Sequence, residues 1–423
     1  MRTFSIFIFL CVLLLSSCGI LRTKSVETPP PIPAVDPLET LHTEIEDVLK
    51  DMLFSTASIG IKVVAVETGE MIYAKNAQKL HHPASTTKLF TAATALAKLG
   101  SEFRFTTALY TDAEKGAQTI NSIYLKGCGD PILKTEDVVN LVVKVAESGI
   151  LSIAGDIIVD ESYFDTVREG PGWMWDDRPY LISALSIRSL EPDPKTASRA
   201  IACGQLLKKT LEEKGVKVSG QVIVGIVPSD FRILAIHESL PLADIVTLMN
   251  KPSDNWIAEM LFKTLGAEVK GEPGSWQKGR EAISAYLVEI LGQPSVHRFV
   301  DGSGLSRYNL VSAELLTQLL VGMYHDFELM PEFTSSLPIA GVDGTLRSRM
   351  RGMYAAKTLR AKTGTLSGVS ALAGYTRSAD GEVLAFGILI SHYVGSAVAA
   401  RGVQDRIGNL LTGFRRRGIR IRK

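Results

Sequence analysis

Residues 83–100 read Pro-Ala-Ser-Thr-Thr-Lys-Leu-Phe-Thr-Ala-Ala-Thr-Ala-Leu-Ala-Lys-Leu-Gly, and this stretch decides how the rest of the chain is interpreted. Its density of Leu, Phe and Ala, closed by Gly100, predicts a helix that is apolar on most faces and therefore buried. Residues three apart share a helix face, so we expect the Lys88 amine beside the Ser85 hydroxyl. A serine is a weak nucleophile until a base takes its proton, and a desolvated lysine with a lowered pKa can be that base. The stretch therefore predicts an activated serine at the start of a buried helix.

This spacing is a weak signal by itself, because it recurs at residues 275–278 (Ser-Trp-Gln-Lys), in a Gly/Pro loop before an expected surface helix. Two other motifs strengthen it. Residues 253–255 (Ser-Asp-Asn) precede an expected helix and would, taken alone, be a helix N-cap. Residues 362–365 (Lys-Thr-Gly-Thr) end an expected strand and would, taken alone, be an edge lysine before a turn. Together, in this order and in these contexts, the three motifs match those of penicillin-binding proteins and class A β-lactamases.

Further stretches resemble the D-alanyl-D-alanine carboxypeptidase/endopeptidase family, the low-molecular-mass class C penicillin-binding proteins (peptidase family S13). The resemblance runs from about residue 40 to 412. It implies an α/β (α+β) fold of the serine β-lactamase/DD-peptidase type, with an antiparallel sheet flanked by helices and a smaller inserted domain. These stretches are Gly127–Leu133, Gly170–Trp175, Asp301–Ser306 and Leu337–Leu346.

The order of expected elements supports this organisation. Strand-like runs occur near both ends of the chain and helical runs between them, which predicts one sheet completed by N- and C-terminal segments. Members of the family commonly carry two inserted domains, but the 168 residues from Ser85 to Ser253 leave room for the first alone. We predict a signal peptide at 1–17, a lipidated Pro-rich tether at 18–39, a DD-peptidase domain at 40–106 and 232–423, and the inserted domain at 107–231.

The resemblance implies acyl transfer through a covalent serine intermediate. Ser85 would attack the carbonyl between the last two D-alanines of a peptidoglycan stem, or a D-centred crosslink, with Lys88 as its base. Ser253 would relay the proton to the leaving amine, beside Lys88 and Lys362, and Asn255 would hold the substrate amide. The same serine makes β-lactams covalent inhibitors.

Substrate binding is also carried over from the resemblance. Thr363, Gly364 and Thr365 follow Lys362, which with Thr363 would bind the terminal carboxylate. The backbone N–H groups of Ser85 and Thr365 would form the oxyanion hole. Arg307 aligns with a family position that contacts the diaminopimelate carboxylate. Asp160, in the inserted domain, would bind the diaminopimelate amine or would merely end a strand.

Composition excludes several other classes of function. The 423 residues carry 46 Lys and Arg against 45 Asp and Glu, a formal net charge of +1. This balance argues against a protein held to nucleic acid by bulk charge. The seven His form no His-x-x-x-His pair and the Cys form no Cys-x-x-Cys pair, so a zinc site has little support. We therefore expect no metal, no organic cofactor and no nucleic-acid partner. The oligomeric state stays open.

Two alternative functions use the same motifs. A β-lactamase must hydrolyse its acyl-enzyme quickly, typically with a water activated by Glu, and the large insertion argues against it. A non-enzymatic lipoprotein would keep the fold to grip peptidoglycan or sense β-lactams. Its weakness is that every residue needed for acyl transfer is present.

The N-terminus predicts export. Phe4–Leu15 is almost wholly apolar but shorter than the roughly 20 residues that span a bilayer, which is typical of a signal peptide. Residues 15–19 (Leu-Ser-Ser-Cys-Gly) resemble a bacterial lipobox, so we expect lipidation of Cys18 and a periplasmic lipoprotein, anchored in the outer rather than the inner membrane. Residues 26–37 hold five prolines and would form an extended tether.

Two other features stay open. Cys128 and Cys203 could form one disulfide in an oxidising compartment or stay separate buried thiols. Residues 415–423 carry six basic side chains and would be a solvated tail or a contact with an anionic surface.

Overall fold

The computed structural model describes residues 36–50, 55–175, 177, 181–193 and 195–416. The predicted signal peptide, Cys18, almost all of the tether and residues 417–423 of the basic tail therefore lie outside the described residues. None of the helices in the described part of the chain combines the length and the apolar composition that crossing a membrane requires.

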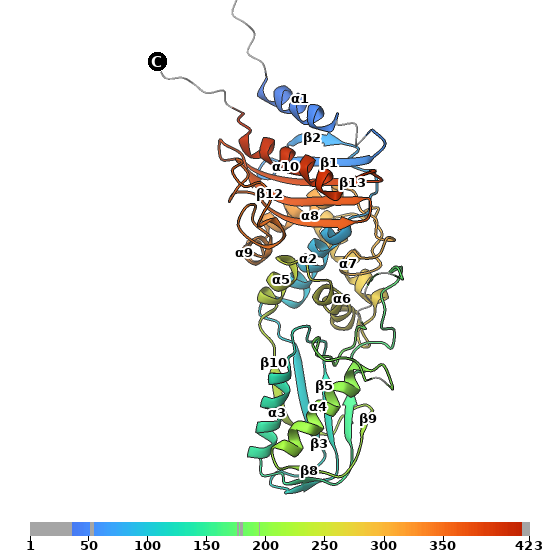
Figure 1. The fold of residues 1–423 in the computed structure, drawn as a ribbon. Coiled ribbons are helices and arrows are strands. Elements are labelled where there is room, and N and C mark those ends of the chain that lie inside the picture. The colour runs from blue at the N-terminus through green and yellow to red at the C-terminus, as the bar shows by residue number, and fades with distance from the viewer. Residues whose placement is uncertain (1–35, 51–54, 176, 178–180, 194, 417–423) are drawn as a thin grey trace, which may run out of the picture. The chain divides into compact units, whose positions relative to one another are not determined.

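A five-stranded antiparallel sheet joins the two ends of the chain, as the sequence predicts (Figure 1). The strand order is β11-β12-β13-β1-β2, and β1 pairs with β13 from Ser58 opposite Ser391 to Ala65 opposite Leu384. The strands span Ser58–Ala65 (β1), Met71–Lys75 (β2), Arg360–Leu366 (β11), Val369–Arg377 (β12) and Val383–Ser391 (β13).

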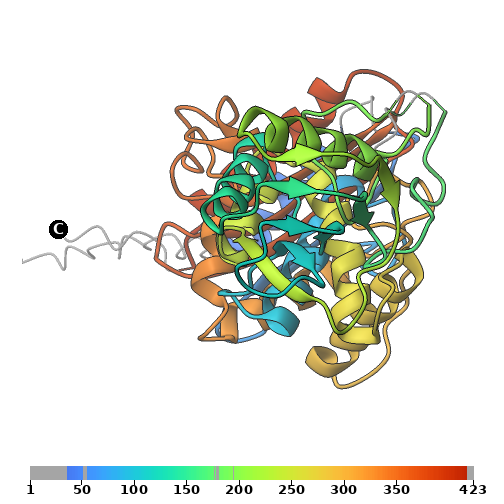
Figure 2. The ribbon, with the colours of Figure 1, turned by 90° about the horizontal axis from the view of Figure 1, so that it is seen from below.

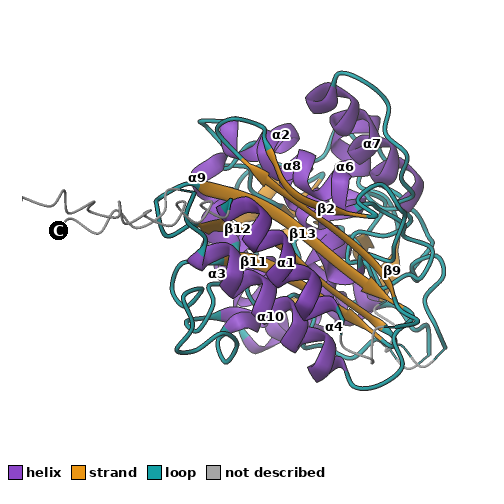
Figure 3. Ribbon diagram, turned by 90° about the horizontal axis from the view of Figure 1, so that it is seen from above, coloured by secondary structure: helices purple, strands orange, loops and turns teal. Residues whose placement is uncertain are grey.

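Helices cover both faces of this sheet. Helices α1 (Pro37–Leu49) and α10 (Ala397–Gly413) lie side by side over one face (Figure 3), and α8 (Ala313–His325) packs on the other. All nine residues of β13 are buried as a result. Because strand side chains alternate between faces, Leu384, Phe386, Ile388 and Ile390 enter the core beneath α1 and α10, whereas Val383, Ala385 and Leu389 enter the core on the α8 side.

The helical layer on the α8 side holds the stretch that opened the sequence analysis. Helix α2 (Thr87–Leu99) packs against the three helices α5, α6 and α7. Every residue of α2 from Thr87 to Leu96 is buried, which confirms the prediction of a buried helix. The remaining helices of this layer are α5 (Leu242–Asn250), α6 (Asn255–Lys270), α7 (Trp276–Leu291) and α9 (Met330–Ser336).

The insertion has its own sheet and its own hydrophobic core, built around residues such as Leu125, Val142 and Leu207 (Figures 1 and 2). Helices α3 (Thr135–Glu147) and α4 (Arg199–Glu213) pack against this sheet. The sheet has the order β10-β3-β5-β7-β9, formed by Thr106–Thr111 (β3), Ile123–Gly127 (β5), Ile157–Asp160 (β7), Val222–Val224 (β9) and Arg232–Glu238 (β10). A small parallel sheet adds Thr119–Ile120 (β4), Ser152–Ile153 (β6) and Lys217–Val218 (β8).

The insertion ends later than the boundary at residue 231 that the sequence suggested. Strand β10 pairs with β3 from Arg232 opposite Thr111 to Glu238 opposite Thr106. Residues 232–238 therefore belong to the inserted sheet and not to the DD-peptidase part. Cys128 and Cys203 are both free thiols in the structure, and burial raises the pKa of Cys203 to about 12.

Candidate active site

The predicted nucleophile and base lie together where α2 begins. A 3-10 turn, Ala84–Thr86, leads into the helix and leaves Ser85 partly exposed. Lys88 is fully buried one turn later, and its Nζ lies 3.0 Å from Ser85 Oγ. The spacing of three residues therefore places amine and hydroxyl side by side, as predicted.

Two other acceptors fix the direction of the Lys88 amine. Its Nζ donates to Asn255 Oδ1 at 2.7 Å and to the backbone oxygen of Ser303 at 2.7 Å. A charged ammonium has three N–H groups, which these two oxygens and Ser85 Oγ satisfy. A neutral amine has two N–H groups and a lone pair. With the two N–H groups held by Asn255 and Ser303, the lone pair points at the Ser85 hydroxyl, which is the geometry of a general base.

Burial brings Lys88 into the pH range where it can act as a base. Loss of solvation lowers the pKa of its amine to about 8, although Glu259, Asp301 and Asp254 stabilise the charged form. A lysine in water titrates near 10.4. The fully buried environment of α2 therefore converts an ordinary lysine into a base that is partly neutral near pH 7.

The loop between α5 and α6 brings the second motif to the same place. Ser253 adopts a left-handed backbone conformation with φ of 65°, and Asp254 caps α6 by accepting a hydrogen bond from Ile257 N at 3.0 Å. Asp254 also pairs with Arg188 of the insertion. Asp254 therefore holds the loop, while Ser253 and Asn255 on either side of it face the catalytic residues.

Strand β11 supplies the third motif. Lys362 is fully buried, and its Nζ donates to Ser253 Oγ at 2.7 Å and to its neighbour's oxygen, Thr363 O, at 3.0 Å. Burial and the nearby charge of Lys88 lower the pKa of Lys362 well below its ordinary value. The alternative of a solvated edge lysine is therefore wrong for Lys362. Thr363 and Thr365 follow on the same strand and reach the surface.

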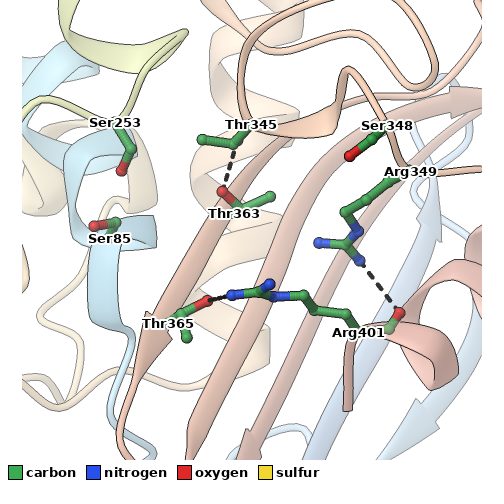
Figure 4. A pocket seen from close by; sticks show the side chains of 8 residues that line it. All are labelled: Ser85, Ser253, Thr345, Ser348, Arg349, Thr363, Thr365 and Arg401. Atoms are coloured by element: carbon green, nitrogen blue, oxygen red, sulfur yellow. Dashed lines mark hydrogen bonds between the residues drawn. The ribbon is translucent and has the colours of Figure 1, made fainter. Parts of the chain in front are cut away.

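These motifs line one cleft of about 390 Å³ (Figure 4). Ser85 and Ser253 lie on one side of it, and Thr363 and Thr365 lie opposite them on β11, with the Thr365 hydroxyl directed at Arg401. Thr363 Oγ1 donates to Thr345 Oγ1 at 2.7 Å, and Arg401 donates to Thr365 Oγ1 at 3.4 Å. The complete lining is Ser85, Ser253, Thr345, Ser348, Arg349, Thr363, Thr365 and Arg401.

Comparison with known proteins identifies the family of this chain. The sequence pattern of the D-Ala-D-Ala carboxypeptidase 3 (S13) family matches residues 41–190 and 192–412. A D-alanyl-D-alanine carboxypeptidase from Actinomadura sp. (strain R39) is 34% identical, with 89% of this chain and 85% of that protein covered. The chain belongs to the S13 family. The family resemblance noted in the sequence is thereby confirmed.

Solved structures agree with this S13 assignment. The structure is similar to that of penicillin binding protein 4 from Haemophilus influenzae, with a TM-score of 0.76, 25% identity, and coverage of 86% of this chain and 97% of that one. The same H. influenzae protein complexed with a β-lactam gives a TM-score of 0.71 at 25% identity, covering 86% of this chain and 98% of that one. The predicted fold class is confirmed.

One glycine of the S13 chain lets the loop of residues 301–306 approach the nucleophile. Gly304 has a φ of +81°, and a Cβ at this position would lie 1.8 Å from the backbone oxygen of Ala84. Ala84 is the residue before Ser85 and itself has a φ of 47°. A side chain at position 304 would therefore displace the turn that presents the nucleophile. The sequence stretch Asp301–Ser306, first noticed as a family resemblance, acquires a physical role here.

Two predicted substrate residues of the S13 chain do not line the cleft. Arg307 is half-buried and donates to Ser367 O at 3.2 Å, just beyond the end of β11. Asp160 is fully buried at the end of β7, where its carboxylate accepts from Ser162 N at 2.9 Å and from Val227 N at 2.8 Å. Asp160 thus ends a strand, and its predicted contact with a substrate amine finds no support in this placement.

Several residues of the S13 site escaped the sequence analysis. Thr345 lies in a stretch that was noticed but given no role, whereas Ser348, Arg349 and Arg401 carry no local motif. Arg349 is held by Asp405 of α10, with Nε to Oδ1 at 2.9 Å. No group of three or more His, Cys, Asp or Glu side chains able to hold a metal ion occurs in the portion that the structure describes.

Proposed function

We propose that this S13 protein is a serine-type D-Ala-D-Ala carboxypeptidase that also cuts D-centred peptidoglycan crosslinks, through an acyl-enzyme on Ser85. The observation that carries the proposal is the buried Lys88 amine, held by Asn255 and Ser303 so that its lone pair faces Ser85 Oγ. Family membership supports the substrate class.

In the first half-reaction, the Ser85 Oγ–H bond breaks and its proton passes to the neutral Lys88 amine. A bond then forms from Oγ to the carbonyl carbon of the penultimate D-alanine. The backbone N–H groups of Ser85 and Thr365 would stabilise the oxyanion that develops on this carbonyl. The C–N bond then breaks, and the departing amine takes the proton of the Lys88 ammonium through the Ser253 hydroxyl, which leaves Lys88 neutral again. Lys362 donates a hydrogen bond to the same Ser253 oxygen.

In the second half-reaction, the neutral Lys88 amine takes a proton from the water that attacks the acyl carbonyl carbon, and returns this proton to Ser85 Oγ as the ester C–O bond breaks. Both kinds of substrate carry a carboxylate next to the leaving amine. The hydroxyls of Thr363 and Thr365, with the Arg401 guanidinium beside Thr365, offer hydrogen bonds and positive charge to that group. The carboxylate of a β-lactam would occupy the same place, in keeping with the β-lactam complex of the H. influenzae protein.

Release of product tests this function. The purified body, residues 36–423, is expected to free D-alanine from a pentapeptide that ends in D-Ala-D-Ala, and to cut a crosslinked muropeptide dimer. Nitrocefin should acylate it without rapid turnover. Rapid nitrocefin hydrolysis with both peptides intact would establish a β-lactamase instead. Stable binding of peptides without any product would establish a non-enzymatic protein.

We further propose that the mature protein is a periplasmic lipoprotein anchored through Cys18, in the outer rather than the inner membrane. The support is the sequence Leu-Ser-Ser-Cys-Gly at residues 15–19 and the absence of Asp after Cys18, a residue that retains some lipoproteins in the inner membrane. Metabolic labelling with a fatty acid, followed by membrane fractionation, tests both parts. Cys18→Ser should lose the label and leave the membrane fraction; a Cys18→Ser protein that keeps the label would contradict the proposal.

A further inference from the structure

A carboxylate without contact with solvent lies behind the catalytic lysine. Glu259 is on α6, four residues and about one turn after Asn255, and it is completely buried. It does not line the cleft. Burying a carboxylate is costly unless its oxygens are hydrogen-bonded, so the partners of Glu259 indicate what it holds in place.

These partners lead directly to Lys88. Glu259 Oε1 accepts from Ser303 N at 2.8 Å, and Oε2 accepts from Gly302 N at 3.2 Å and from Trp276 Nε1 at 2.7 Å. The carboxylate thereby fixes the backbone of residues 302–303. The backbone oxygen of Ser303 is one of the two acceptors that orient the Lys88 amine. The backbone oxygen of Gly302 accepts from Thr91 Oγ1 at 2.8 Å, which ties the same segment to α2.

We propose that Glu259 is a positioning residue that aims the Lys88 amine at Ser85 and stabilises the ammonium that forms when Ser85 gives up its proton. Asn255 contacts Lys88 directly, and Glu259, on the same face of α6, contacts it through the backbone of residues 302–303. One helix thus sets both acceptors of the base. The inference rests on the proposed function, since it concerns the proton transfer that starts acylation.

The charged groups around Lys88 decide whether its ammonium or its neutral amine is favoured. The carboxylates of Glu259 from α6, Asp301 from the loop before α8 and Asp254 from the α6 N-cap stabilise its ammonium. Lys362 on β11 is the neighbouring amine, and the charge of Lys88 lowers the pKa of Lys362. Burial and the charge of Asp301 raise the pKa of Glu259 to about 7. The hydrogen bonds from Ser303, Trp276 and Gly302 favour the charged form of Glu259, and this charged form stabilises the ammonium of Lys88.

Asp301 holds the other side of the same loop. It accepts from Gly304 N at 2.9 Å, from Ser306 N at 2.6 Å and from Asn309 Nδ2 at 2.7 Å. The two buried carboxylates thus tie down the loop from both sides, but it is Glu259 that bonds the N–H of Ser303, whose carbonyl faces the base. We therefore place the test on Glu259.

The test is the pH profile of Ser85 acylation by a fluorescent penicillin in Glu259→Gln. Glutamine has one carbonyl oxygen, and its NH₂ would oppose N–H groups that now bond a carboxylate. We expect the limiting acylation rate at high pH to fall by about ten- to a hundredfold, because small displacements of a catalytic group cost this much. The inflection should move to lower pH by about one unit, since loss of a nearby negative charge disfavours the ammonium. The dissociation constant of the non-covalent penicillin complex should stay unchanged.

Two further variants distinguish the effect of the Glu259 charge from a general disturbance of α6. Glu259→Asp keeps the charge but is too short to reach both backbone N–H groups, so it should lower the limiting rate and leave the inflection near that of the wild type. Glu268→Gln is the matched control on the same helix. Glu268 is exposed and accepts from Tyr163 Oη at 2.6 Å, and its variant should match the wild type in both quantities.

An unchanged inflection and limiting rate in folded Glu259→Gln would refute the proposal. So would equal losses in the Gln and Asp variants with no shift, which a merely structural carboxylate would give. If Glu259→Gln does not fold, Trp276→Phe removes one hydrogen bond to the carboxylate and should also move the inflection to lower pH; an unmoved inflection would reject the proposal. Absence of any Ser85 adduct in the wild type would instead refute the proposed function.

Discussion

Ser85→Ala is expected to abolish the covalent penicillin adduct and to lower D-alanine release by about 10⁶-fold, the loss seen when the nucleophile of a serine hydrolase is removed. The physical reason is that Ser85 presents a partly exposed hydroxyl in the cleft, 3.0 Å from the buried Lys88 amine, whose other two hydrogen bonds direct its lone pair at Oγ. Mass spectrometry of a tryptic digest after labelling with fluorescent penicillin measures the outcome. In the wild type the adduct should map to the peptide that contains Ser85.

The chain supplies its own control for this experiment. Ser275 has the same spacing to Lys278 as Ser85 has to Lys88, but its hydroxyl caps α7 by accepting from Lys278 N at 3.2 Å. Ser275→Ala should keep the adduct and the activity and cost about 1 kcal/mol of stability, the ordinary cost of a lost N-cap. An adduct that persists in Ser85→Ala, or that maps to Ser253, would show that the nucleophile has been wrongly assigned.

The catalytic residues could be predicted because each motif is local. Ser85 and Lys88 occupy one turn of one helix, so their contact follows from helical spacing. Ser253 and Asn255 flank a residue that caps α6, and Lys362 begins the Lys-Thr-Gly-Thr motif of β11. Strands at the two chain ends also pair as predicted, since β1 and β13 carry apolar residues that need a covered sheet.

What could not be predicted depends on contacts between distant segments. In the sequence, Glu259 is one of four charged residues in a largely apolar helix. Its role appears only when residues 302–303 are brought against it from more than 40 positions away. For Asp160 the sequence left two roles open, a substrate contact or the end of a strand, and the structure places it at the end of β7 with backbone partners. A buried aspartate that accepts from nearby backbone N–H groups has the same sequence appearance as one that faces a ligand. Similarly, β10 was assigned to the wrong domain because only its pairing with β3 reveals its place.

Lys88→Met is expected to slow acylation by about 10²- to 10⁴-fold, which is the usual contribution of a general base. Methionine has nearly the length of lysine and lacks the amine, so the variant tests the base without removing the nucleophile. Its stability is measured separately, because the change removes the cost of desolvating a cation but leaves the buried acceptors Asn255 Oδ1 and Ser303 O without their donor. Stopped-flow measurement of penicillin acylation, with a thermal melt of the same sample, separates loss of catalysis from loss of stability.

The acylation rate should depend on pH through the fraction of Lys88 that is neutral. With an ordinary lysine pKa of about 10.4, about one amine in 2,500 is neutral at pH 7, whereas with the lowered pKa of about 8 the fraction is about one in 11. Only the neutral amine can accept the Ser85 proton. The wild-type acylation rate should therefore rise about tenfold per pH unit below pH 8 and level off above it, and Lys88→Met should lose this inflection together with the rate.

Lys98→Met, ten residues along the same helix, provides the control. Lys98 pairs with Glu289 at the protein surface, where a single ion pair contributes about 0–1 kcal/mol, and its loss should leave both the rate and the profile unchanged. If Lys88→Met kept the wild-type inflection near pH 8, the proton acceptor would have to be another group. Lys362 would then be the candidate, since its fully buried amine reaches Ser253 Oγ at 2.7 Å. Conversely, a flat profile in Lys88→Met assigns the inflection to Lys88, because Lys362 is still present in that variant.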